Sequence, residues 1–421
     1  ATPAPSFQKR AIISISAALA AFLAYSCVYA YRKPFTIAEF EGLKFWGITY
    51  QTLLIISQVV GYMLSKFYGI KFIAELNRLG RYRTAVLLVG IAWICLLFFA
   101  IVPAPYGIIF LFINGFVLGF LWGIIFSYLE GRKATDFMGA VMAVSFIFAG
   151  GFTRSVAKWL MLQFNVNEWW MPFLTGLVFA VPLIFFLWIL EKIPAPTNED
   201  IAEKVVRKPM NKQERRTLLK KFGVGLIVIT MSYLFLTVMR DIRDNYMSNI
   251  WKELGYGSDY GVFAKTETLT CLVVLAIMGL LVLVRKNIAA LSLVHIVIAS
   301  GLLLAGLSSL LFIMNIMDGA VWMQLVSMGL YMGYIPFNCI FFERMIAAFR
   351  IAGNVGFLMY FADSFGYLGS VAVMLFREFS GLQLNWSQFY SYGVMVCILP
   401  ALAGTIYSYI YFNKKYRLPV S

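Results

Sequence analysis

The segment that decides the fold is Tyr25-Ser26-Cys27-Val28-Tyr29-Ala30-Tyr31-Arg32-Lys33-Pro34-Phe35, which ends the first long apolar run of the chain. In the second half of the chain, Tyr233, Thr237 and Arg240 repeat the spacing of its first tyrosine, its second tyrosine and its arginine. Residues at i, i+4 and i+7 lie on one face of a helix. Because an arginine in a membrane span is costly, its presence favours a function. The two arginines therefore predict a shared binding site for an anion.

The composition is that of a membrane protein. The 421 residues are 61% hydrophobic, 17% aromatic and only 13% charged, whereas a soluble domain has about 25% charged residues. Apolar runs of about 20 residues, each long enough to cross a bilayer, recur along the whole chain. We therefore expect an all-α integral membrane protein with twelve transmembrane helices. The expected spans are 11–31, 46–70, 84–102, 106–129, 137–164, 171–190, 222–245, 260–284, 288–316, 320–342, 351–376 and 386–412.

The distribution of charge predicts the orientation of the chain. The net charge of +15 comes from basic residues in short loops, which is the positive-inside pattern and no sign of a nucleic-acid partner. One side carries few basic residues, mainly Lys44, Lys252 and Arg377. We therefore expect a multi-pass membrane protein with both termini in the cytoplasm.

Residues 191–221 divide the chain into two halves. Prolines followed by a charged run predict a cytoplasmic linker with an amphipathic helix on the membrane surface. The predicted domains are an N-terminal six-helix bundle at 1–190, the linker at 191–221 and a C-terminal six-helix bundle at 222–421. Four short matches in the same order indicate a parallel repeat, with bundles related by a pseudo-two-fold axis and a site between them. The matches pair 119–130 with 333–343, 130–132 with 343–344, 46–47 with 260–261, and 155–157 with 370–372.

One loop carries a family resemblance. Glu75-Leu76-Asn77-Arg78-Leu79-Gly80-Arg81-Tyr82-Arg83 resembles the D-R-x-G-R-R signature of the major facilitator superfamily (MFS), with Asn77 in place of the aspartate. Within the superfamily, the chain most resembles the organophosphate:phosphate antiporters, which carry glycerol phosphate and hexose phosphates; an uncharacterised bacterial branch of the superfamily is the alternative. The resemblance implies a location in the bacterial inner (cytoplasmic) membrane. The patches that carry this likeness are Tyr31–Phe35, Gly61–Phe67, Arg240 with the stretch after it, and Glu267.

The resemblance implies that Arg32 and Arg240 grip an anionic group from opposite bundles, with Lys66 nearby. Guanidinium suits this role because it presents a fixed fork to phosphate or carboxylate and keeps its charge when desolvated. The alternative is that both arginines, and Lys66 at its own end of a span, extend to the membrane interface. The chain also departs from the antiporters: residues 146–151 hold no histidine, and the only histidine is His295.

Further residues are candidates for the binding site. Tyr25, Tyr29 and Tyr233 follow the arginine faces and are candidate substrate contacts, and Glu267 stands where the antiporters carry an acid. Arg154, one turn from Lys158 in the fifth span, is a candidate third anion contact.

Other charged residues are candidates for coupling or gating. Asp363 lies in the middle of the eleventh span, where a lone carboxylate is either a proton carrier or the partner of an arginine. Arg243 and Asp244 add charge beside Arg240, and Arg240 with Asp244 at i, i+4 predicts either a structural pair or a gate. At the cytoplasmic helix ends, Glu130 beside Arg132 and Glu343 beside Arg344 predict gating or structural pairs.

The sequence as a whole predicts a secondary active transporter for an organic anion, either a phosphorylated or an acidic sugar derivative. We expect alternating access coupled to proton symport through Asp363; the alternatives are exchange against inorganic phosphate and a membrane-embedded sensor of the same anion. The expected partners are the anion, protons or phosphate, and the bilayer, with the chain a monomer. No cofactor, metal or catalytic residue is expected, since the sequence has no metal-ligand cluster, nucleophile elbow or nucleotide loop. The five cysteines lie in separate apolar runs and are expected to be core residues.

Overall fold

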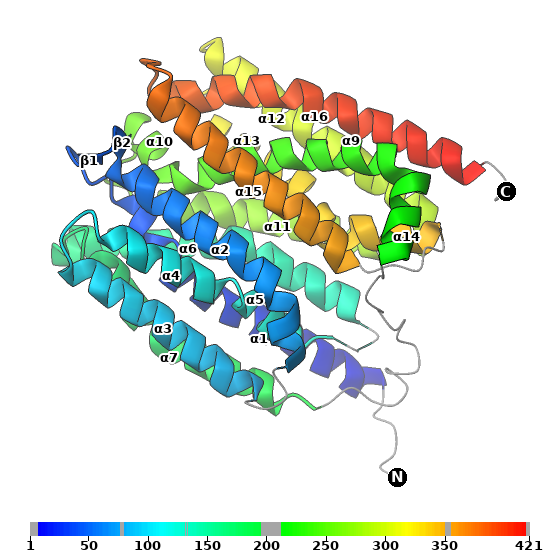
Figure 1. Ribbon diagram of the computed structural model, residues 1–421, viewed down its shortest axis with the longest axis horizontal. Coiled ribbons are helices and arrows are strands. Elements are labelled where there is room, and N and C mark those ends of the chain that lie inside the picture. Colours follow the sequence, from blue (N-terminus) through cyan, green and yellow to red (C-terminus); the bar gives the residue numbers. More distant parts are fainter. Residues whose placement is uncertain are drawn as a thin grey trace. The chain divides into compact units, whose positions relative to one another are not determined.

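The computed structural model describes residues 7–75, 80–130, 132, 134–194, 212–349 and 355–417, and helices dominate them (Figure 1). A helix satisfies its own backbone N–H and C=O groups by internal hydrogen bonds, and this is required in a membrane because hydrocarbon offers no hydrogen-bond partners. Ten stretches of the described chain are long and apolar enough to cross a membrane. Two more helices, of 26 and 25 residues, occupy the second and eleventh expected spans. The predicted all-α membrane fold is confirmed.

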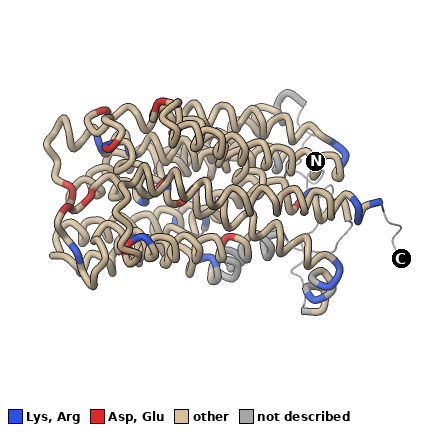
Figure 2. The backbone as a smooth tube through the Cα atoms, turned by 90° about the horizontal axis from the view of Figure 1, so that it is seen from above, with Lys and Arg blue, Asp and Glu red and all other residues tan. Residues whose placement is uncertain are grey.

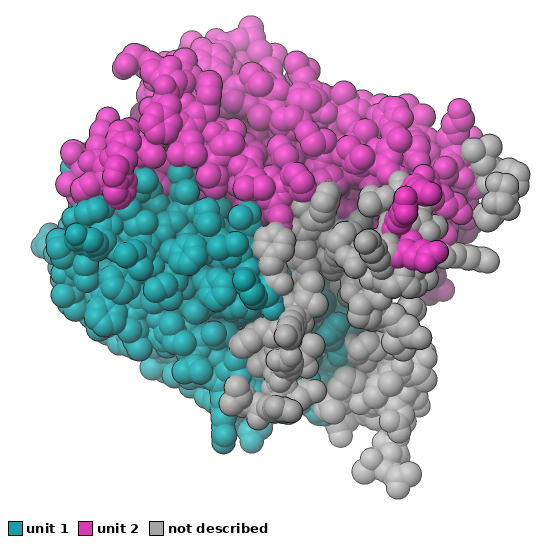
Figure 3. All heavy atoms as spheres, viewed as in Figure 1, with its two compact units in different colours: residues 1–41, 53–205 teal, residues 42–52, 206–421 magenta. Residues whose placement is uncertain are grey.

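The chain divides into two compact units, coloured separately in Figure 3. Unit 1 comprises residues 1–41 and 53–205, and unit 2 comprises 42–52 and 206–421. The main division therefore falls within the expected linker. Sequence analysis assigns all of 1–190 to the first bundle, but the short segment 42–52 groups with unit 2.

Unit 1 is a helical bundle around α1. Within it, α1 packs on α6 and α7, and α3 packs on α4 and α7. The fourth expected span is made of two consecutive helices, α4 and α5. The elements are α1 (Phe7–Val28), the 3-10 turns η1 (Tyr29–Tyr31) and η2 (Pro34–Ile37), α2 (Tyr50–Glu75, whose first residues belong to unit 2), α3 (Arg81–Ile101), α4 (Gly107–Leu118), α5 (Leu121–Phe126), α6 (Thr135–Phe164) and α7 (Met171–Lys192).

Unit 2 is built around α9 and α12. Here α9 packs on α15 and α16, while α12 packs on α13 and α16. The tenth expected span contains a π-helical turn, η4, which follows Pro336. The elements are β1 (Lys44–Phe45), β2 (Ile48–Thr49), α9 (Lys212–Asn245), α10 (Met247–Glu253), α11 (Val262–Val282), α12 (Asn287–Ile313), α13 (Gly319–Pro336), η4 (Phe337–Phe341), α14 (Phe342–Ala348), α15 (Val355–Phe379) and α16 (Trp386–Arg417).

The hairpin of β1 and β2 belongs to unit 2 through hydrogen bonds to α15. The strands are antiparallel, with Lys44 opposite Thr49, and Gly47 takes the positive φ of +79° that the tight turn needs. The Glu378 carboxylate accepts hydrogen bonds from the Thr49 hydroxyl (2.6 Å) and the Thr52 hydroxyl (2.8 Å). The hairpin is thereby attached to the last turn of α15.

The linker prediction is only partly within the described chain. Residues 195–211 lie outside it. Residues 212–221 form the first turns of α9, so the described part of the linker continues directly into the seventh span. Figure 2 shows that most of the helical length is uncharged and that basic residues lie beside the C-terminus. The last turn of α16 carries Lys414, Lys415 and Arg417.

Candidate functional site

Arg32 lies on the face of a tyrosine ring in unit 1. It is only 8% exposed, and its Cζ is 3.8 Å from the ring centroid of Tyr62 and 5.8 Å from that of Tyr29. A guanidinium over an aromatic ring is attracted to the negative ring face. Lys66 approaches the same ring of Tyr62, with Nζ 5.2 Å from the centroid. The structure thus brings Arg32 and Lys66 together at the ring of Tyr62, and it places Tyr29 near Arg32.

The expected common face of Tyr25, Tyr29 and Arg32 is altered by a break in the helix. The α-helix ends at Val28, and a 3-10 turn carries the chain to Arg32. Tyr25 and Tyr29 still contact each other edge to face at 5.6 Å, and Tyr25 also packs against Trp122. In unit 2, by contrast, α9 continues as one helix through Arg240 to Asn245.

Arg240 lies on the face of a tyrosine ring in unit 2. Its Cζ is 4.0 Å from the ring centroid of Tyr334. The guanidinium also forms an ion pair with Asp241, whose other oxygen accepts a hydrogen bond from the Ser370 hydroxyl at 2.9 Å. The sequence predicts Asp244 as a partner of Arg240, and the structure shows an ion pair of Arg240 with the adjacent Asp241, which the sequence analysis did not name.

Asp363 and Tyr233 are joined by a hydrogen bond in the core of unit 2. The Tyr233 hydroxyl donates to the Asp363 carboxylate, and both side chains are buried. The Tyr233 ring stacks on that of Tyr334 at 5.4 Å, the same ring that carries Arg240. Asn338, in the π-helical turn, donates to the Tyr334 carbonyl at 3.1 Å. A continuous series of contacts therefore leads from Asp363 to Arg240.

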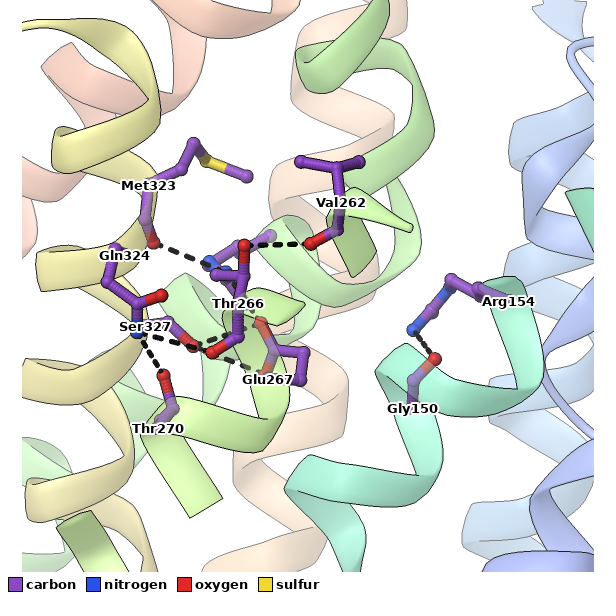
Figure 4. Close-up of polar contacts among 10 residues, drawn as sticks. Gly150, Arg154, Val262, Thr266, Glu267, Thr270, Met323, Gln324 and Ser327 are labelled. Atoms are coloured by element: carbon purple, nitrogen blue, oxygen red, sulfur yellow. Dashed lines mark hydrogen bonds and ion pairs between the residues drawn. The ribbon is translucent and has the colours of Figure 1, made fainter. Parts of the chain in front are cut away.

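A second buried charge pair in unit 2 joins Arg243 and Glu267 (Figure 4). Arg243 Nη2 lies 2.7 Å from Glu267 Oε1, and their side chains are 2% and 1% exposed. The Ser327 hydroxyl lies 3.1 and 3.2 Å from the two carboxylate oxygens. Arg243 also donates to the Met323 carbonyl at 3.3 Å. Two candidates that the sequence placed in different roles, one gating and one substrate-binding, are thus partners.

Arg154 is fully buried in unit 1 and contacts its own helix and the turn η2. Its Nε donates to the Thr36 hydroxyl at 3.0 Å, and its Nη1 donates to the Gly150 carbonyl at 3.0 Å (Figure 4). The Thr36 hydroxyl in turn donates to the Lys33 carbonyl at 2.8 Å. Arg154 therefore supports the turn that directly follows Arg32.

The candidates at the helix ends are half-buried. Arg132, expected beside Glu130, donates to the Pro194 carbonyl. Arg344, expected beside Glu343, donates to the Asn287 side chain at 2.9 Å. Both arginines thus bind polar groups at the ends of neighbouring segments, and the predicted pairs with Glu130 and Glu343 stay predictions.

His295 and three of the five cysteines are core residues, as predicted. The His295 Nε2 lies 3.0 Å from the Ser408 hydroxyl inside unit 2. Cys27, Cys95 and Cys271 are buried, whereas Cys339 and Cys397 are half-buried, and the five cysteines form no disulfide. Within the described ranges, no group of three His, Cys, Asp or Glu side chains is arranged to hold a metal.

Sequence reasoning missed the two tyrosines on whose rings the arginines lie, and it missed Asp241, the acid that pairs with Arg240. Tyr62 and Tyr334 lie on helices α2 and α13, far from their arginines in sequence, so no local spacing connects them. A signal existed for Asp241, because it directly follows Arg240, and for Asn338, because Pro336 disturbs the helix just before it.

A comparison with models of protein families identifies the family of this chain. A family model described as a family of unknown function, DUF5690, matches residues 34–415. The chain belongs to the DUF5690 family. None of the curated proteins matches this DUF5690 protein.

Solved structures resemble it over nearly its whole length. The nucleoside transporter NupG has a TM-score of 0.59 and 14% identity, with 96% of this chain and 99% of that chain covered. The MFS proton:xylose symporter XylE, solved with 6-bromo-6-deoxy-D-glucose, has a TM-score of 0.64 and 14% identity, with 96% of each chain covered. Identity this low establishes the fold alone. The DUF5690 protein has the MFS fold, as the sequence predicted, while its likeness to the antiporter branch stays a prediction.

Proposed function

We propose that this protein is a secondary active transporter that moves an organic anion, a phosphorylated or acidic sugar derivative, by alternating access. One observation carries the proposal: each unit holds an arginine on the face of a tyrosine ring. These pairs are Arg32 on Tyr62 and Arg240 on Tyr334. Transport is supported by the fold, which the chain shares with a nucleoside transporter and a xylose symporter.

The chemistry of the two pairs favours an anionic substrate. The ring attracts the flat face of the guanidinium and leaves its in-plane N–H donors directed sideways. Phosphate and carboxylate accept such donors in pairs. Rings beside the arginines, including Tyr29 and Tyr233, suit the apolar faces of a sugar.

The contacts of Asp363 support proton symport as the coupling mode. Asp363 accepts from Tyr233, Tyr233 stacks on Tyr334, and Tyr334 carries Arg240. Protonation of Asp363 would remove the negative charge that accepts the hydrogen bond from the Tyr233 hydroxyl. That change would be passed to the ring on which Arg240 lies, so proton binding and anion binding would be linked.

The arginine pair is tested by uptake into proteoliposomes with a panel of phosphorylated, sulfated and uronic-acid sugars. Arg32→Lys and Arg240→Lys should each lose most of the uptake, since an ammonium cannot form the bidentate fork. Arg285→Lys, in an exposed turn of unit 2, is the matched control and should transport normally. Normal transport by both lysine variants at positions 32 and 240 would overturn the proposal.

The coupling mode needs a separate experiment. An imposed inward proton gradient should drive accumulation of the anion, and Asp363→Asn should keep exchange but lose accumulation. If uptake ignores the gradient and instead requires phosphate trapped inside the vesicles, exchange against phosphate is the correct mode.

A further inference from the structure

The end of α1 leaves backbone carbonyls that the helix itself does not pair. The α-helix stops at Val28, and the N–H groups of Arg32 and Lys33 both donate to the carbonyl of Tyr29, each at 3.0 Å. The chain then turns through η2, which begins at Pro34, a residue that has no backbone N–H to donate. A buried carbonyl without a donor is costly.

Two buried amide side chains supply those donors. Asn114 Nδ2, from α4, donates to the Tyr31 carbonyl at 3.0 Å, and Gln58 Nε2, from α2, donates to the Arg32 carbonyl at 2.9 Å. The exposed fractions of Asn114 and Gln58 are 0% and 4%. Both carbonyls at the break are therefore capped from neighbouring helices.

The two amides also hold each other in place. Gln58 Nε2 donates to Asn114 Oδ1 at 2.8 Å, and Asn114 Nδ2 donates to the Ala92 carbonyl on α3 at 3.0 Å. An amide nitrogen has two N–H donors, and here both donors of each side chain are used. The network fixes the backbone of Arg32 against three helices.

Glycines bring the two amide-bearing helices together. A Cβ at Gly115 would lie 2.2 Å from the Gln58 carbonyl oxygen, and a Cβ at Gly61 would lie 2.2 Å from the Phe112 carbonyl oxygen. Only glycine permits so close an approach. On α2, Gln58 and Tyr62 are four residues apart and share one face. That face thus carries the amide for the Arg32 backbone and the ring for its guanidinium.

We propose that Gln58 and Asn114 are positioning residues of the anion site, which set the location of Arg32 and thereby the affinity for substrate. This inference rests on the proposed function, in which Arg32 binds the anion. The two residues act on Arg32 through its backbone, and their loss would displace the guanidinium from the ring of Tyr62.

Near-isosteric apolar variants test the network. Gln58→Met and Asn114→Leu remove the donors while keeping similar volume. We expect the KM for uptake to rise about tenfold, which corresponds to about 1.4 kcal/mol of binding free energy, with a smaller change in the maximal rate. Thr175→Val is the matched control: it also removes a buried hydrogen bond in unit 1, from the Thr175 hydroxyl to the Met171 carbonyl at 2.8 Å. It should leave KM unchanged.

A double-mutant cycle separates positioning from general stability. In an Arg32→Lys background, Gln58→Met should add little to the KM, because the group that it positions is already gone. Equal effects in both backgrounds would overturn the inference. The cycle needs only Gln58→Met and Arg32→Lys, so it can be measured even if Asn114→Leu does not fold.

Hydrogen exchange gives a readout that needs no substrate. Peptides covering residues 29–37 should exchange faster in Gln58→Met than in the parent protein or in Thr175→Val. Unchanged exchange would overturn the inference even if transport is confirmed. Conversely, faster exchange together with normal uptake by Arg32→Lys would leave the positioning network standing and refute the role of Arg32 in transport.

Discussion

The buried ion pair of Arg243 and Glu267 allows a direct test of how an uncompensated buried charge affects the stability of the protein. The substitution Glu267→Gln keeps the size and much of the hydrogen bonding of the side chain but removes its charge. Arg243 would then remain as a cation whose charged partner is lost, in a place where its side chain is 2% exposed. Water cannot compensate it there, and the Met323 carbonyl is a weak substitute.

The expected size of the effect follows from this burial. Removing one partner of a buried ion pair costs about 3–5 kcal/mol. Because a domain of about 200 residues loses about 2–4 °C of melting temperature per kcal/mol, we expect a fall of about 6–20 °C. The double variant Arg243→Met/Glu267→Leu removes both charges and should recover most of that loss, since apolar replacements of buried pairs are often neutral.

The assay is thermal unfolding of purified protein in detergent at one fixed heating rate, because unfolding of membrane proteins is commonly irreversible. The control is Lys265→Met, which removes an ion pair of the same unit whose lysine is 78% exposed and whose Nζ lies 3.8 Å from Asp259. Exposed pairs contribute only about 0–1 kcal/mol, so this variant should melt close to the parent. A double variant as unstable as Glu267→Gln would refute the reasoning, because the uncompensated charge would then not be the cause.

Three further predictions concern the hairpin, one loop carboxylate and the topology. Glu378→Gln weakens the acceptor that holds the two hairpin threonines, so exchange at residues 42–52 should become faster while exchange in α12 stays unchanged. Burial raises the pKa of Glu168 above its usual value, although the hydrogen bond from the N–H of Phe40 opposes the shift. The folded protein then holds this proton more tightly than the unfolded chain does, so the melting temperature should fall as pH rises through the raised pKa. Glu168→Gln should lose this pH dependence. Accessibility tags at both termini and near Met210 should report the cytoplasm, and a tag near Gly257 the opposite side; an external tag near Met210 would contradict the predicted orientation.

The fold was predictable from sequence because its main determinant is local. A run of about 20 apolar residues must form a helix in hydrocarbon, whatever surrounds it. The exceptions arise where distant contacts decide. The segment 42–52, which holds the hairpin and the first residues of α2, overlaps the second expected span but groups with unit 2. The reason is that Thr49 and Thr52 donate to Glu378, more than 300 residues later in the chain. No local pattern contains that partner.

The candidate site was predictable in its charged residues and in the tyrosines that precede the two arginines on their own segments. Arg32 and Arg240 stand out because charge is rare in apolar runs, and the repeat relates them to each other. Their surroundings were not predictable, because Tyr62 and Tyr334 are two among many aromatics in the chain. Gln58 and Asn114 were missed for a related reason. Their importance comes from the end of α1 at Val28, and the apolar sequence pattern gives no sign that the helix ends there.

The two arginines that lie on tyrosine rings have different charged neighbours, although the sequence repeat relates their positions. On Tyr62, Arg32 is accompanied by a second cation, Lys66, so two positive charges surround one ring. On Tyr334, Arg240 is already paired with Asp241. An anion that binds Arg240 must therefore replace a carboxylate, which exchanges one ion pair for another and gains little energy. That exchange releases Asp241, which also holds Ser370 on α15. Within unit 2, we therefore expect the arrival of an anion at Arg240 to loosen the contact between α9 and α15.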